Sequence, residues 1–156
     1  MTIDLRRTGP DGTAFFDGVS LALVTVPAVD RRQIAIVLSD AQDNTSFFDE
    51  ATLLDAARRT DAVVYTVVAE SAGHARSPFL TRLQSLSVLT GGRLVVADRD
   101  AQIGGALVDA LEEFRHSYVV RYVLRSVPLE GWHKLTVKVH GPRRYSVRAR
   151  VGYFGS

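Results

Sequence analysis

The sequence has no cysteine among its 156 residues, and this absence excludes disulfide bonds, thiolate zinc sites and cysteine nucleophiles. No apolar run approaches the length of about 20 residues that a membrane-spanning helix needs. The segment 1–7 is charged and lacks an apolar centre, so it does not resemble a secretory signal peptide. As written, the chain is therefore expected to be cytoplasmic and to contain no membrane segment.

Sequence motifs of the common enzyme classes are also missing. The chain has no Gly-x-Gly-x-x-Gly, no phosphate-binding loop ending in Gly-Lys-Ser/Thr and no Gly-x-Ser-x-Gly nucleophile turn. Its four histidines lack the spacing of zinc ligands, and the adjacent acids Glu112 and Glu113 are expected to lie on a solvated helix face. We therefore expect a protein that is not an enzyme; an enzyme acting on small molecules is left only as an analogy of fold.

Charge is unevenly distributed, although the formal net charge is only +2. Residues 1–115 contain 11 basic and 16 acidic side chains, whereas residues 116–156 contain 8 basic side chains and a single acid. Such a contrast predicts a change of architecture near residue 116. We expect an α/β domain over 1–116 and a C-terminal β-strand extension, packed on it, over 117–156.

Continuous apolar runs at 33–39, 62–69 and 93–97 are typical of parallel strands buried on both faces. Helical spacing of apolar residues precedes the first run and separates the others, at 15–23, 50–60, 78–90 and 100–114. This alternation predicts an α/β fold, a Rossmann-like open parallel sheet with helices on both faces.

Beyond residue 116 the apolar period changes to two. Leu135, Val137 and Val139 alternate with polar residues, as do Tyr145, Val147, Ala149, Val151 and Tyr153. Together with 118–124, these segments predict a three-stranded antiparallel β meander with one packed and one basic, solvated face.

Two short polar segments contain the candidate functional residues. Thr13 precedes the first predicted helix, and Asp40 follows the apolar run at 33–39. Ligands of open α/β folds bind at the carboxyl ends of the strands, so we expect Thr13 and Asp40 to meet at that rim of the sheet. A hydroxyl and a carboxylate from separate loops suit a hard cation such as Mg²⁺.

Each of these residues also has a purely structural interpretation. Thr13 suits the N-cap of the helix that follows it, and Asp40 and Asp43 suit a turn and the cap of the next helix. Asp49 is predicted to cap the helix at 50–60.

The order of three motifs resembles a von Willebrand factor A domain. They are Gly-Thr-Ala-Phe-Phe-Asp-Gly (12–18), Ile-Ala-Ile-Val-Leu-Ser-Asp (34–40) and Leu-Leu-Asp-Ala-Ala-Arg-Arg-Thr-Asp-Ala-Val-Val-Tyr-Thr-Val (53–67). The later Leu-Thr-Gly-Gly-Arg (89–93), Ser-Tyr-Val-Val-Arg-Tyr (117–122) and Tyr-Ser-Val-Arg-Ala-Arg-Val-Gly-Tyr-Phe (145–154) are similar to a bacterial branch described as VWFA-related. The resemblance covers nearly the whole chain.

The resemblance implies a metal-ion-dependent adhesion site in which Thr13 matches the threonine and Asp40 the aspartate. The family's Asp-x-Ser-x-Ser loop has no counterpart before Thr13. We therefore expect an N-terminally truncated domain that lacks its first strands and has an incomplete adhesion site with doubtful Mg²⁺ binding. An upstream start would allow an exported bacterial protein.

The function implied by the resemblance is a non-enzymatic, adhesion-type protein-interaction module. Without its first strands, the run at 33–39 would have an exposed edge open to self-association or strand exchange. The alternative function is nucleic-acid binding through basic strands of the extension. That surface would comprise Arg121, Lys134, Lys138, Arg144, Arg148 and Arg150, with Tyr122 nearby. These side chains could instead be solvated or dock on the acidic remainder of the chain.

Overall fold

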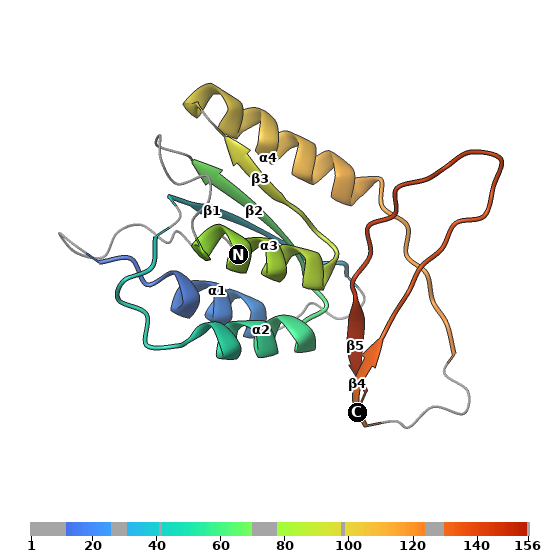
Figure 1. The fold of residues 1–156 in the computed structure, drawn as a ribbon, viewed down its shortest axis with the longest axis horizontal. Coiled ribbons are helices and arrows are strands. Elements are labelled where there is room, and N and C mark those ends of the chain that lie inside the picture. Colours follow the sequence, from blue (N-terminus) through green and yellow to red (C-terminus); the bar gives the residue numbers. More distant parts are fainter. Residues whose placement is uncertain are drawn as a thin grey trace.

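The computed structural model describes residues 12–25, 31–40, 42–69, 78–97, 99–123 and 130–155 (Figure 1). In chain order, the elements are α1 (Phe15–Val24), β1 (Ile34–Ser39), α2 (Glu50–Arg59), β2 (Val63–Ala69), α3 (Pro78–Thr90), β3 (Leu94–Ala97), α4 (Asp100–Arg115), β4 (Gly131–Lys134) and β5 (Gly152–Gly155). The α/β class is therefore confirmed, and the predicted parallel strands are found within one residue of their expected bounds.

The parallel sheet has the strand order β1-β2-β3. β2 lies in the middle, with Ile34 in register with Val63 on one side and Thr66 in register with Leu94 on the other. Its valines Val64 and Val67 have no exposed surface, because helices cover both faces of this strand. Figure 1 shows α1, α2 and α3 on one face of the sheet and α4 on the other.

The larger core lies between the sheet and α1, α2 and α3. The ring of Phe79 lies 5.2 Å from that of Phe15 and 5.8 Å from that of Phe16. Leu53 and Leu83 fill the space toward β2 and are almost completely buried. A smaller cluster of Val67, Ala97 and Ala106 packs under α4 on the opposite face. The pattern of buried positions thus follows the two-sided burial that the apolar runs predict.

A glycine pair ends α3 and starts the approach to β3. Gly91 has φ of +89°, a left-handed conformation that glycine adopts without a Cβ penalty. The Gly92 N–H donates to the Ser87 carbonyl oxygen at 2.9 Å, which closes the end of the helix. A Cβ atom on Gly92 would lie 2.0 Å from the Val64 carbonyl oxygen, so the backbone of the turn lies directly against β2.

The predicted three-stranded meander is wrong in extent. In the described part of the extension only β4 and β5 pair, antiparallel, with Trp132 opposite Phe154 and Lys134 opposite Gly152, and β4 ends before the alternating run at 135–139 begins. The segments 117–123 and 135–150 are described but are not in strands, and Leu124 lies outside the described residues. Figure 1 shows the chain between β4 and β5 as a long arm that extends away from the sheet. An alternating pattern forms a strand only where a surface covers its apolar side, and Val137 and Val139 remain about half exposed.

Across the described ranges, every helix is too short or too polar to cross a membrane.

Candidate functional site

The segments containing the two predicted site residues lie close together where β1 ends. The Thr13 N–H donates to Asn44 Oδ1 at 2.7 Å, and the Asn44 N–H donates back to the Thr13 carbonyl oxygen at 3.1 Å. Asp40 directly follows β1 and is exposed. It precedes the segment 42–49, which contains Asn44 and which we call the second loop. The structure therefore joins the two predicted loops, and the residue that makes the contact with Thr13 is Asn44.

The N-terminus of α1 is capped from this second loop. Asp43 Oδ2 accepts the Phe16 N–H at 2.8 Å, and Ser46 Oγ accepts the same N–H at 3.0 Å. Ser46 Oγ in turn donates to Asp43 Oδ2 at 2.6 Å. The N-cap position itself is Ala14, which makes no side-chain cap. Asp43 thus satisfies a helix amide that would otherwise have no partner.

These contacts correct two structural interpretations made from the sequence. Thr13 is not the N-cap of α1, and Asp43 caps the helix that precedes it in the chain and not the one that follows. The cap of α2 is Asp49, whose Oδ1 accepts the Thr52 N–H at 2.9 Å, as predicted. That hydrogen bond lowers the pKa of the Asp49 carboxyl below its usual value. Local sequence spacing identifies a cap within its own helix, whereas a cap supplied by a distant loop depends on tertiary packing.

Asp17, in the first turn of α1, also binds the backbone of the second loop. Its Oδ2 accepts the Phe47 N–H at 2.9 Å and its Oδ1 accepts the Phe48 N–H at 2.7 Å. These two hydrogen bonds fix the backbone of Phe47 and Phe48, whose side chains are exposed to solvent. Phe47 is 91% exposed and Phe48 is 42% exposed. We call Phe47 and Phe48 the aromatic rim.

The carboxylates near Thr13 are occupied by hydrogen bonds and do not form a magnesium site with several protein ligands. Both oxygens of Asp17 and both of Asp43 already accept hydrogen bonds from main-chain amides. In the described part of the chain, no group of three or more histidine, aspartate or glutamate side chains is arranged to hold a metal ion. Of the described acids in these two segments, Asp40 is the one to which the structure assigns no main-chain hydrogen bond, so it would be the carboxylate ligand beside Thr13.

A second polar cluster surrounds Glu113 on α4. Its Oε1 accepts hydrogen bonds from Tyr65 Oη at 3.0 Å and from Arg148 Nε at 3.1 Å. Its Oε2 accepts one from Arg148 Nη2 at 2.5 Å and lies 3.3 Å from Arg93 Nε. Glu113 thus joins β2, the start of β3 and the C-terminal extension. The expectation of a solvated face was wrong for Glu113, and the opposite net charges of the two parts of the chain were the available signal.

Burial, together with the hydrogen bond to Glu113 and the charge of that carboxylate, raises the pKa of Tyr65 to about 12. Since an unfolded tyrosine titrates near pH 10, the folded protein keeps this proton while the unfolded chain loses it. The unfolded state then binds fewer protons, so we expect stability to fall between about pH 10 and pH 12. Burial also raises the pKa of Tyr153, so ultraviolet titration of the five tyrosines should show more than one late ionisation, and the one near pH 12 should be missing in Tyr65→Phe. A wild-type chain without a late-titrating tyrosine would contradict this expectation.

Arg150 makes the second attachment of the extension. Its Nη1 donates to Asp61 Oδ1 at 2.9 Å and its Nη2 to the Arg58 carbonyl oxygen, at the end of α2, at 3.2 Å. The positive charge of the Arg150 guanidinium interacts favourably with the negative, C-terminal end of the α2 dipole. Arg148 and Arg150, two of the six basic residues considered for nucleic-acid binding, therefore dock on acidic side chains of the same chain.

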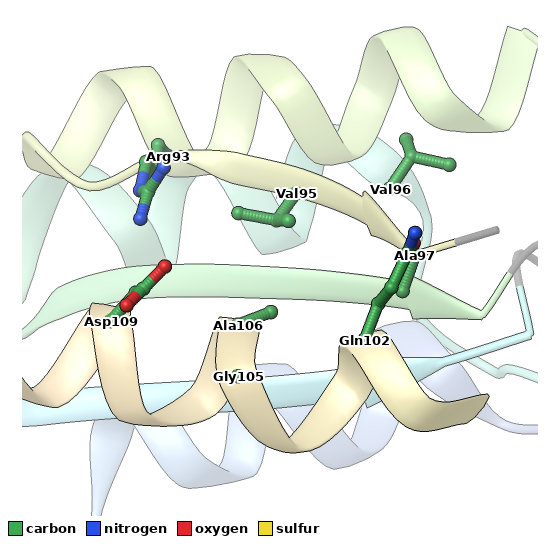
Figure 2. A pocket seen from close by; sticks show the side chains of 8 residues that line it. All are labelled: Arg93, Val95, Val96, Ala97, Gln102, Gly105, Ala106 and Asp109. Carbon is green, nitrogen blue, oxygen red and sulfur yellow. The ribbon is translucent and has the colours of Figure 1, made fainter. Parts of the chain in front are cut away.

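A shallow groove of about 310 Å³ lies between β3 and α4 (Figure 2). Val95, Ala97, Gly105 and Ala106 form its apolar part. Figure 2 shows Arg93 and Asp109 at one end, with Gln102 beside Ala97 at the other. The described lining residues include no hydroxyl or imidazole side chain.

Comparison of the chain with protein-family models, curated proteins and solved structures finds no match. The assignment of function therefore rests on the sequence resemblance and on the residues described above.

Proposed function

We propose that this chain is a non-enzymatic protein-interaction module of the von Willebrand A type, which binds its partner through the aromatic rim. The observation that supports this proposal most is the fixed exposure of Phe47. Its amide is held by Asp17 while 91% of its surface faces solvent. A large aromatic side chain on a fixed backbone loses little conformational freedom when it enters a pocket on a partner.

The neighbouring residues define the chemistry of that partner. Phe48 adds a second ring, edge-on to Phe47 with the ring centres 5.9 Å apart. The complementary surface is an apolar pocket. Under this proposal Thr13 and Asp40 are the remnants of the adhesion site, and binding of the partner does not require Mg²⁺.

Phe47→Ser is expected to weaken partner binding by roughly tenfold or more, since central aromatic residues dominate interface energetics. The measurement is the amount of partner that the immobilised chain recovers from extracts, at the same density for the wild type, Phe47→Ser and Tyr118→Ser. Tyr118→Ser is the matched control, because Tyr118 is 96% exposed on the extension and lies outside the rim. Equal recovery with Phe47→Ser and Tyr118→Ser would contradict the proposed surface.

The exposed edge of β1 is a second feature for which we propose a partner. The sequence predicts self-association or strand exchange there, and β1 has a single strand neighbour, β2, in the described part of the chain.

A further inference from the structure

Among the described residues, β1 pairs along one edge only, and its other edge lacks the features that normally prevent pairing. β1 is a six-residue strand, Ile-Ala-Ile-Val-Leu-Ser, and it is paired with β2 in unbroken register from Ile34 to Ser39. It contains no lysine, no proline and no bulge, which are the usual means of protecting an edge strand. Leu38 is 51% exposed. An edge of this composition favours the addition of another strand.

We propose that the partner strand is β1 of a second copy, paired antiparallel about a two-fold axis perpendicular to the sheet. The side chains of Ala35 and Val37 pack into the core under α1, α2 and α3. By alternation, Ile34, Ile36 and Leu38 belong to the face covered by α4. Such an axis leaves the α4 face on the same side in both copies, so that even-numbered residues lie opposite even-numbered residues.

Of the registers that place even-numbered residues opposite each other, charge complementarity favours one. With Ile36 on the axis and opposite itself, Ile34 lies opposite Leu38, and Arg32 lies opposite Asp40 of the second copy. The symmetry forms each of these pairs twice. Arg32 and Asp40 are both exposed, and a shift of two residues in either direction separates them. Oppositely charged residues directly across an antiparallel pair are stabilising, whereas like charges are not.

The position of Arg32 agrees with this arrangement. Its guanidinium lies over the Phe114 ring at 4.6 Å, and Nη1 donates to the Ser117 carbonyl oxygen at 3.2 Å. Arg32 is therefore held on the side of α4, the side on which Asp40 of the second copy would lie. The same pairing covers the exposed Leu38 of one copy with Ile34 of the other.

Single cysteines test the register, because the chain contains no cysteine of its own. Residues directly opposite in an antiparallel pair have Cα atoms about 4.5–5.5 Å apart, within the range of about 4.4–6.8 Å that a disulfide spans. Ile36→Cys is therefore expected to give a covalent dimer on mild oxidation. In Leu38→Cys the two thiols would lie about 13 Å apart along the strand and are expected not to join.

This comparison separates the proposed register from random collision, since Leu38 is the more exposed of the two side chains. Cross-linking of Leu38→Cys at a rate equal to or above that of Ile36→Cys would overturn the proposal. A wild-type chain that sediments as a monomer at high micromolar concentration would also overturn it, and would leave the edge to a strand from another protein.

Charge exchange gives an independent measurement on the same interface. Arg32→Asp and Asp40→Arg are each expected to raise the dimer Kd roughly tenfold, because each places like charges opposite one another at both ends. The double variant should return to within about twofold of the wild type, and Asp109→Arg, on α4, should not change the Kd. Failure of the double variant to recover would overturn the register.

The inference does not depend on the proposed function. The Arg32→Asp variant should still bind a partner through Phe47, and Phe47→Ser should still form the dimer. The failure of one proposal is therefore distinguishable from the failure of the other.

Discussion

Replacement of Gly92 by alanine is expected to lower the free energy of unfolding by about 3 kcal/mol or more. The new Cβ would lie 2.0 Å from the Val64 carbonyl oxygen, a main-chain atom. The clash cannot be relieved by a change of rotamer, and β2 cannot retreat because it is paired with β1 and β3 on its two sides. Denaturant unfolding followed by circular dichroism measures the loss.

The control for this variant is Gly104→Ala, in the interior of α4. A Cβ at Gly104 meets no atom within 4 Å, and alanine favours the helix, so its stability is expected to rise by about 0.5–1 kcal/mol. Equal stability of the two variants would show that the turn after α3 does not lie against β2 as described.

Glu113→Ala is the second large expected effect, a loss of about 2 kcal/mol of stability. The change removes the acceptor of the Tyr65 hydroxyl and the carboxylate that Arg148 and Arg93 share. The Glu113 side chain is only 26% exposed, so water does not fully replace these contacts. Release of Arg148 should also make limited trypsin cleavage at that residue faster.

Glu112→Ala is the matched control on the same helix. Glu112 is 49% exposed and pairs with Arg115 and His116 of its own final turn. Exposed pairs of this kind contribute little, so the change is expected to stay within about 0.5 kcal/mol. If Glu112→Ala and Glu113→Ala destabilised the chain equally, Glu113 would not be the link between the extension and the sheet.

The parallel sheet was predictable because its strands are buried on both faces and are therefore apolar at nearly every position. Val64 and Val67, for example, face opposite sides of β2 and both are completely buried. The end of α3 was predictable for a similar reason, since Gly91 has the positive φ that the helix stop requires. In both cases the residue type reports on its own local environment.

The remaining features depend on contacts between distant parts of the chain. Asp43 lies in a loop and Asp17 in the first turn of α1, and their hydrogen bonds span 27 to 31 positions in the sequence. Arg148 and Glu113 are 35 positions apart. The alternation at 135–151 indicated strands, but the pattern alone does not specify which surface covers them, and the pairing stops after β4 and β5.

The glycine pair also has a consequence for the order of events during synthesis. A Cβ on Gly91 would lie 2.7 Å from the Arg150 amide nitrogen, so the turn after α3 also receives the C-terminal extension. The hydrogen bonds that form this turn join residues 87–92, so all of their partners are translated long before residue 150. The segment around residue 150 therefore packs onto a turn whose residues were translated well before it.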